Sequence, residues 1–428
     1  MKLSLKLPIY TILVLLVTNS VFSEDSKYLG TGSCSSSNCH GSVNPIKGSR
    51  ILQNEYVTWV KKDAHSKAWR ILTNEDSKKI AHNLGIGEPS KETLCLNCHS
   101  TNIPSHLRGE KYSIEDGVTC ESCHGAAENW LKSHASSKTS HNENLENGMR
   151  DLVSLEKRSE FCLSCHLGTD NKFVNHKMIG AGHPRLSFEL DTFSMTQPKH
   201  WELDTDYQER KASYEPIRAW LIGQTQISIQ TVKLLASDKR TKNGIWPELS
   251  LFNCYACHHS LTSKQWLKRE YKYGPGELRL NLSSLLVVKE SLSILDNELA
   301  TLISLKLEEL HEQYKVGKAQ PLLKSMEEIL SNQIIKLVSK DPLNSVTARK
   351  LLQKIVSLAA NTPHFQYEEA EQLAMGISAI LSSNKPLEKK LFKQVEALYT
   401  SLRSPEEFVA EEFRESAREL LHSDEFQH

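Results

Sequence analysis

The stretch Cys254-Tyr255-Ala256-Cys257-His258-His259 decides how this sequence is interpreted. Two thiols three positions apart, with a histidine directly after the second, form the arrangement that tethers a haem through two thioether bonds while the histidine binds the iron. The order of these residues therefore predicts a covalently attached haem at this point of the chain.

Four further copies of the motif lie upstream. Three have the same spacing, and the first has four residues between its thiols. Together the five copies use all ten cysteines, which we expect to hold five c-type haems: Cys34 and Cys39, Cys95 and Cys98, Cys120 and Cys123, Cys162 and Cys165, Cys254 and Cys257. The expected proximal iron ligands are the histidines that end the motifs: His40, His99, His124, His166 and His258.

Disulfides and zinc ribbons are the alternative interpretations of these cysteines. Neither explains why a histidine follows the second cysteine in every copy. The wider motif at Cys34 and Cys39 leaves a structural disulfide open at that position.

The N-terminus has the pattern of a secretory signal peptide over residues 1–23. Lys2 and Lys6 precede an apolar run at Ile9 to Val17, and small residues lie near Ser23. We therefore expect an exported, periplasmic protein with no transmembrane segment after cleavage. An uncleaved membrane anchor is the alternative, although the run is short for a span.

The chain carries 52 basic and 52 acidic residues, so it lacks the excess of positive charge that would indicate nucleic acid as a partner. We expect a mainly α protein in two parts. Residues 24–275 would form a pentahaem cytochrome domain with short helices and little regular structure, and residues 276–428 an all-α helical bundle without cysteine.

Helical periodicity supports this division. Apolar residues from Leu285 to Leu302 follow a three-four spacing, which predicts one long amphipathic helix. Further helices are expected to begin at Pro321, Ser345, Tyr367, Pro386 and Ser404. The leucine stripes fit a buried core better than a surface for a partner.

The second axial position of each iron decides what a haem does, because a second histidine suits electron transfer and an open position admits a substrate. In decreasing order of preference, the candidates are His65, His134, His183, His176, His259 and His200. We expect His82, His106 and His141 to lie on the surface, and the histidines after residue 300 to bind no iron.

The chain resembles the multihaem cytochrome family that includes cytochrome c554, which is related in haem packing to hydroxylamine oxidoreductase and pentahaem nitrite reductase. The resemblance rests on residues 33–41, 63–69, 117–125, 182–190 and 246–248. It implies closely packed haems, mostly with two histidine ligands, and one haem that can be five-coordinate. The fifth motif and the widened first motif depart from the family pattern.

Three functions are compatible with these motifs. The motifs favour a periplasmic electron carrier between redox partner proteins, with no catalytic residue. The alternatives are an oxidoreductase acting on a small nitrogen or sulfur compound at one five-coordinate haem, and a redox or gas sensor.

Overall fold

The computed structural model describes residues 26–46, 48, 51–211, 213–241, 248–254, 257–258, 279–362, 366–403, 405 and 407–427. Within these ranges the fold is mainly α, as expected. The described residues form no strand, and two isolated bridges join Tyr28 to Arg108 and Phe252 to Leu280.

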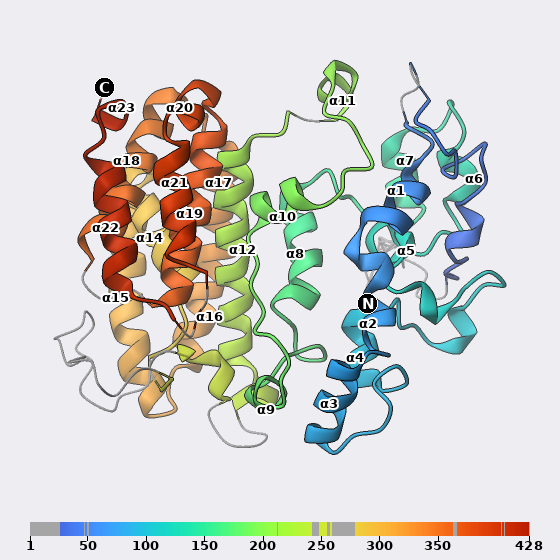
Figure 1. Ribbon diagram of the computed structural model, residues 1–428, viewed down its shortest axis with the longest axis horizontal. Helices are drawn as coiled ribbons and strands as arrows, with labels where there is room; N and C mark the ends of the chain where they lie inside the picture. The colour runs from blue at the N-terminus through green and yellow to red at the C-terminus, as the bar shows by residue number, and fades with distance from the viewer. Residues whose placement is uncertain are drawn as a thin grey trace, which may run out of the picture.

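The described chain has two parts that lie side by side (Figure 1). We call residues 26–211 the motif region, because they contain the first four cysteine motifs. The helical bundle consists of α12 and the helices from α14 onward. Helices α8 and α10 belong to the motif region and lie against α12 at the junction.

The motif region is built of short helices joined by turns. Their bounds are η1 Thr31–Ser33, α1 Glu55–Lys62, η2 Ala64–Lys67, α2 Ala68–Ile71, α3 Glu75–Leu84, α4 Thr93–His99, η3 Ser105–Leu107, η4 Ile114–Asp116, α5 Cys120–His124, α6 Leu131–His134, α7 His141–Glu146, α8 Leu155–His166, α9 His176–Gly180, α10 Leu190–Thr196 and α11 Thr205–Arg210.

Local signals set the ends of these helices. The Asn74 side chain accepts a hydrogen bond from the N–H of Ser77 at the start of α3, and Gly85 ends that helix with a φ of 69°. A capping box between Ser140 and Glu143 begins α7. Such caps stabilise helices that bury few side chains of their own.

The remaining helices are longer and carry the apolar core. Their bounds are α12 Pro216–Ala236, α13 Asp238–Thr241, η5 Leu249–Leu251, α14 Ser283–Leu295, α15 Asn297–Lys315, α16 Gln320–Ile329, η8 Leu330–Ile334, α17 Ile335–Lys340, α18 Ser345–Asn361, α19 Tyr367–Ser382, α20 Lys385–Lys390, α21 Phe392–Thr400, α22 Ala410–Leu421 and α23 Asp424–Gln427.

Helix α12 is the central helix of the molecule. It packs against α8 and α10 on one side and against α14, α16, α17 and α19 on the other. Trp220 on this helix has no exposed surface, and a Cβ atom added at Gly376 of α19 would lie 2.7 Å from its ring. The absence of a side chain at Gly376 therefore lets α19 approach α12 closely.

The prediction of one long helix from Leu285 to Leu302 is wrong. The chain leaves the helical conformation at Asp296, where φ is −157° and ψ is 97°, and α14 and α15 are separate helices. The Asp296 carboxylate accepts hydrogen bonds from the N–H groups of Glu298 and Leu299 and so begins a new helix. The apolar residues keep their helical spacing across the break, because α14 and α15 both pack against the same core.

The other helix starts agree with the predictions to within a residue, with one exception. The last predicted start is Ser404, whereas α22 begins at Ala410. Ser404 and Glu406 lie outside the described residues, as do the expected signal peptide and the expected boundary at residue 275. Within the described ranges, every helix is too short or too polar to cross a membrane.

Candidate haem sites

The motif cysteines and histidines are placed by short helical turns. In α4, α5 and α8 the motif occupies the C-terminal turn, and the histidine is the last residue of the helix. Helical spacing puts residues three and four apart on one face, so both thiols and the histidine lie on the same side. In the fifth motif the N–H of His258 donates to the carbonyl oxygen of Cys254 at 2.8 Å, which forms a similar turn.

The first motif has a different local structure, as its wider spacing requires. The N–H of His40 donates to the carbonyl oxygen of Cys34 at 3.2 Å, and the N–H of Gly41 donates to that of Ser36 at 2.9 Å. These bonds fold the two extra residues into a loop, and the His40 ring lies close to the Cys34 thiol. All ten motif cysteines are free thiols in the structure.

Each of the five motif histidines faces a second histidine from a distant part of the chain. The separations between ring centres are 6.2 Å for His40 and His134, 6.3 Å for His99 and His183, 6.3 Å for His124 and His200, 6.1 Å for His166 and His65, and 6.2 Å for His258 and His176.

These separations fit a metal ion held between each pair of rings. An imidazole nitrogen binds a transition-metal ion at about 2.0–2.1 Å, and the ring centre lies roughly 1 Å beyond that nitrogen. Two rings that bind one ion from opposite sides therefore have their centres about 6 Å apart. Aromatic rings in direct contact have centres about 4.5–7 Å apart, so it is the recurrence of one separation at all five motifs, rather than the distance alone, that indicates a metal ion between the rings.

Within the described residues, no group of three or more His, Cys, Asp or Glu side chains could hold a bare metal ion. Each site could thus provide two histidine nitrogens and two thiols, and the remaining ligands of an ion would have to come with a cofactor. A haem brings four nitrogen ligands of its own, so these residues fit a haem.

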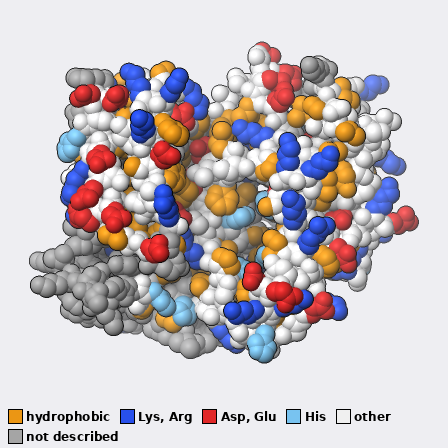
Figure 2. Space-filling model, viewed as in Figure 1, with side chains coloured by type: hydrophobic (Ala, Val, Ile, Leu, Met, Phe, Trp, Pro, Cys, Tyr) orange, Lys and Arg blue, Asp and Glu red, His pale blue; other side chains and the backbone are white. Residues whose placement is uncertain are grey.

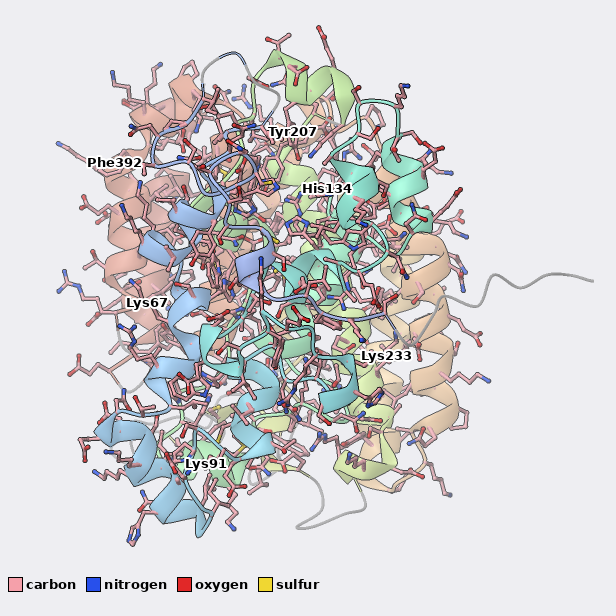
Figure 3. The ribbon with its side chains drawn as sticks, turned by 90° about the vertical axis from the view of Figure 1, so that its right-hand side faces the viewer. Lys67, Lys91, His134, Tyr207, Lys233 and Phe392 are labelled. Atoms are coloured by element: carbon pink, nitrogen blue, oxygen red, sulfur yellow. The ribbon has the colours of Figure 1, made fainter. Side chains whose placement is uncertain are left out.

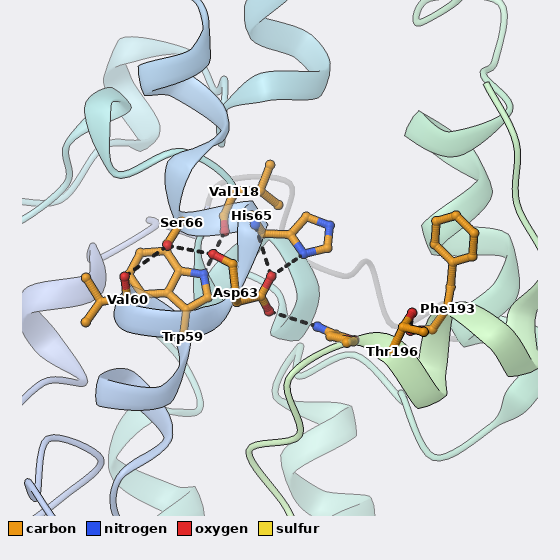
Figure 4. Close-up of polar contacts among 9 residues, drawn as sticks. Trp59, Val60, Asp63, His65, Ser66, Val118, Phe193 and Thr196 are labelled. Carbon is orange, nitrogen blue, oxygen red and sulfur yellow. Dashed lines mark hydrogen bonds and ion pairs between the residues drawn. The ribbon is translucent and has the colours of Figure 1, made fainter. Parts of the chain in front are cut away.

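Hydrogen bonds orient several of these rings through Nδ1. Nδ1 of His40 lies 2.9 Å from the Glu55 carboxylate, and Nδ1 of His65 lies 2.9 Å from the Asp63 carboxylate (Figure 4). In three further rings Nδ1 lies within hydrogen-bond distance of a backbone carbonyl oxygen, to which an Nδ1–H group can donate: His99, His134 and His183. When the Nδ1–H group of a neutral imidazole donates a hydrogen bond, Nε2 carries no proton and is free to bind a metal ion. This arrangement is typical of metal-binding histidines.

The electrostatic environment keeps the most buried rings neutral. Burial lowers the pKa of His124 to about 3 and that of His166 to about 4. Burial also lowers the pKa of His99 and of His200. A neutral imidazole is the form that binds a metal ion. The hydrogen bonds to Glu55 and Asp63 instead raise the pKa of His40 and of His65.

Thiols from different motifs lie against one another. The Cys34 thiol interacts with that of Cys120, and the Cys98 thiol interacts with that of Cys165. The Sγ atom of Cys165 also lies 4.0 Å from the carbonyl oxygen of Asn97. The first motif therefore lies beside the third, and the second beside the fourth.

Five of the six candidate partners from the sequence lie opposite a motif histidine, namely His65, His134, His176, His183 and His200. The sixth, His259, lies outside the described residues. His82, His106 and His141 are exposed, as expected. Sequence reasoning missed Glu55 and Asp63 as carboxylates that orient His40 and His65, although Asp63 is recognisable two residues before its histidine.

Comparison with known proteins gives a partial match. No curated protein and no solved structure matches the chain. Residues 33–125, which contain the first three motifs and His65, match the family model described as cytochrome c554 and c-prime. This segment is therefore similar to cytochromes of the c type, in which haem is covalently bound and serves electron transfer.

Proposed function

We propose that the protein is a five-haem c-type cytochrome that carries electrons between redox partners. The observation that supports this most strongly is the set of five histidine pairs with ring centres 6.1 to 6.3 Å apart. Each pair contains one motif histidine, so every motif has its own candidate for the second axial ligand.

The chain would hold each haem through the two thiols of a motif and the two histidines of a pair. When bound, haem iron supplies reversible one-electron chemistry. The protein residues orient the rings and leave eight of them only partly exposed, whereas His176 and His258 of the fifth pair are exposed.

Two histidines on each iron favour a carrier over an enzyme. A substrate needs an open axial position, and the five pairs would leave none open if each pair held one haem iron. The alternative, an oxidoreductase for a small nitrogen or sulfur compound, would require one of these histidines to leave its iron.

The thiol contacts suggest the order in which electrons pass. The first motif lies beside the third and the second beside the fourth, while the Cys123 thiol lies in the electrostatic field of Cys162 and Cys165. His176, the partner of the fifth motif, is the first residue of the five-residue helix α9, and His183, the partner of the second motif, follows shortly after that helix. We therefore infer a route through motifs one, three, four, two and five.

The expected signal peptide at residues 1–23 supports a periplasmic location, where c-type haems are attached and redox proteins are the natural partners. Intact mass measurement on the purified protein should detect five covalent haems. Four haems would mean that Cys34 and Cys39 do not bind one.

A low-temperature electron paramagnetic resonance spectrum of the oxidised protein tests the axial ligands. We expect low-spin signals alone, and no carbon monoxide binding by the reduced protein. A high-spin ferric signal together with carbon monoxide binding would overturn the carrier function and favour the oxidoreductase.

A further inference from the structure

A basic patch covers the surface of α1, η2 and α2. It consists of the exposed side chains Lys61, Lys62, Lys67 and Arg70, with the exposed aliphatic side chains Val60 and Ile71 at its edges. Val60 is 42% exposed and Ile71 is 47% exposed. Blue side chains gather over the same helices in Figure 2.

The patch is compact, because the end of α1 folds back on η2. Nζ of Lys67 donates to the carbonyl oxygen of Lys61 at 3.5 Å, and Oγ of Ser66 donates to that of Val60 at 3.4 Å. Lys67 lies at the outer edge of the motif region in the side view (Figure 3). The four cations thus share one small area of the surface.

The positive charge of the patch is not neutralised locally. Within the described residues, none of its four cations forms an ion pair, whereas the neighbouring Lys78 and Lys91 pair with Glu75 and Glu88. The one acidic residue between Val60 and Ile71 is Asp63, which is 3% exposed and points inward. Its carboxylate binds His65 and Gln197 (Figure 4).

A candidate axial ligand lies at the centre of this patch. His65 stands between Lys62 and Lys67 in the chain, its side chain is 39% exposed, and its ring faces His166. The surface charge is therefore placed over the fourth haem site.

We propose that this patch docks an acidic redox protein, which exchanges electrons with the haem held by His65 and His166. The inference rests on the proposed function. Four unpaired cations would steer an acidic partner toward the site, and two exposed aliphatic side chains would give short-range contact. A small patch of this kind suits the brief encounters of electron-transfer proteins.

The charge balance of the whole chain supports an acidic partner over a general attraction to anions. The sequence has no net charge, and about ten propionates on five haems would make the loaded protein acidic. An acidic partner would thus be repelled by most of the surface and attracted at the patch. Charge complementarity selects both the partner and the place of docking.

The test compares two double variants of the loaded protein. Lys61→Glu with Lys67→Glu reverses charge in the patch. Lys389→Glu with Lys390→Glu makes the same change at exposed positions of α20 in the bundle. The probe is a reduced plant-type ferredoxin, a strongly acidic one-electron protein, and stopped-flow absorbance follows reduction of the haems.

We expect the patch variant to react at least tenfold more slowly at low salt, with a weaker dependence on ionic strength, and the bundle variant to stay within about twofold of the parent. Equal slowing of both variants would overturn the docking site, because net charge alone would then explain the rates. Sedimentation with phosphatidylglycerol vesicles tests whether the patch binds an anionic membrane surface instead of an acidic protein. Patch-dependent binding to vesicles with an unchanged ferredoxin rate would also overturn the proposal.

Haem content and spin state are measured on the same samples. Five low-spin haems with no loss of rate in the patch variant would reject the docking site and leave the proposed function intact. A parent protein that lacks five low-spin haems would reject the proposed function itself.

Discussion

The Asp63 carboxylate accepts a hydrogen bond from Nδ1 of His65 at 2.9 Å and a second from the backbone N–H of His65 at 3.0 Å. Gln197 donates a third at 3.1 Å. Burial opposes a charge on Asp63, but the hydrogen bonds outweigh it and lower its pKa to about 2. An ionised carboxylate at this position raises the electron-donating power of the imidazole.

Replacing Asp63 with asparagine should therefore change the reduction potential of one haem. Asp63→Asn keeps the shape of the side chain and removes its charge, so the oxidised iron loses stabilisation. We expect one potential to rise by tens of millivolts in a spectroelectrochemical titration. Asp76→Asn, at an exposed position of α3, is the control and should leave all five potentials unchanged.

Removing His200 should open one axial position. The ring centre of His200 lies 6.3 Å from that of His124, and the other four motif histidines each face a different histidine. We expect His200→Ala to convert one of five haems to high spin and to let it bind carbon monoxide. His141→Ala, at an exposed site, should do neither. An unchanged spectrum for His200→Ala would remove this residue from the ligand set.

The buried Glu189 should make stability depend on pH. Burial raises its pKa from 4.5 to about 7, although its carboxylate accepts hydrogen bonds from the N–H groups of Asp191 and Thr192. Because the folded state holds this proton more tightly than the unfolded state, stability from this group is present below pH 4.5. It is lost as the pH rises through 7.

Guanidinium unfolding of Glu189→Gln and of the parent at pH 5 and pH 7.5 measures this effect. The glutamine cannot ionise, so the variant should lose less stability between the two values, by up to roughly 3 kcal/mol. Identical pH dependence in the two proteins would contradict the role of Glu189.

Arg218 should contribute to stability without affecting the haems. Its guanidinium donates to the carbonyl oxygens of Val338, Ser339 and Asp341 at 2.8 to 2.9 Å, and these residues end α17. Arg218→Met removes these bonds and should lower the free energy of unfolding by about 2–3 kcal/mol. The haem spectrum should stay the same. A spectral change would mean that Arg218 also supports a haem site.

Because α19 approaches Trp220 closely, adding a single methyl group at Gly376 should destabilise the fold. Gly376→Ala would place a Cβ atom 2.7 Å from the indole ring, and the overpacking should cost about 1–3 kcal/mol. At Gly180 an added Cβ meets nothing within 4 Å, so Gly180→Ala should be tolerated. Thermal unfolding of both variants measures the difference.

The mainly α fold could be predicted because the longer helices repeat their apolar residues at helical spacing. The break at Asp296 could not be predicted from periodicity, since α14 and α15 face one core and the apolar pattern runs through the break. A capping aspartate before Asn297 and Glu298 was the local signal.

At the candidate site, the local sequence pattern predicts the motifs but not the contacts between distant residues. Cysteine and histidine spacing is local, so the five motifs were visible in the sequence. The histidine pairs join residues far apart in the chain, as with His65 and His166, and no local pattern specifies which distant histidine faces which motif. Context could rank candidates, but only the tertiary structure could pair them.

Helix α12 buries 14 of its residues between the motif region and the other helices of the bundle, including Trp220 and Leu235. Its outer face is covered by α14 and α19, which follow it in the chain by about fifty residues and by more than a hundred. During synthesis this apolar helix therefore stays uncovered until the C-terminal third of the chain has emerged. A truncated chain that ends after the last motif would expose this surface to water, and aggregation rather than a smaller cytochrome is its expected fate.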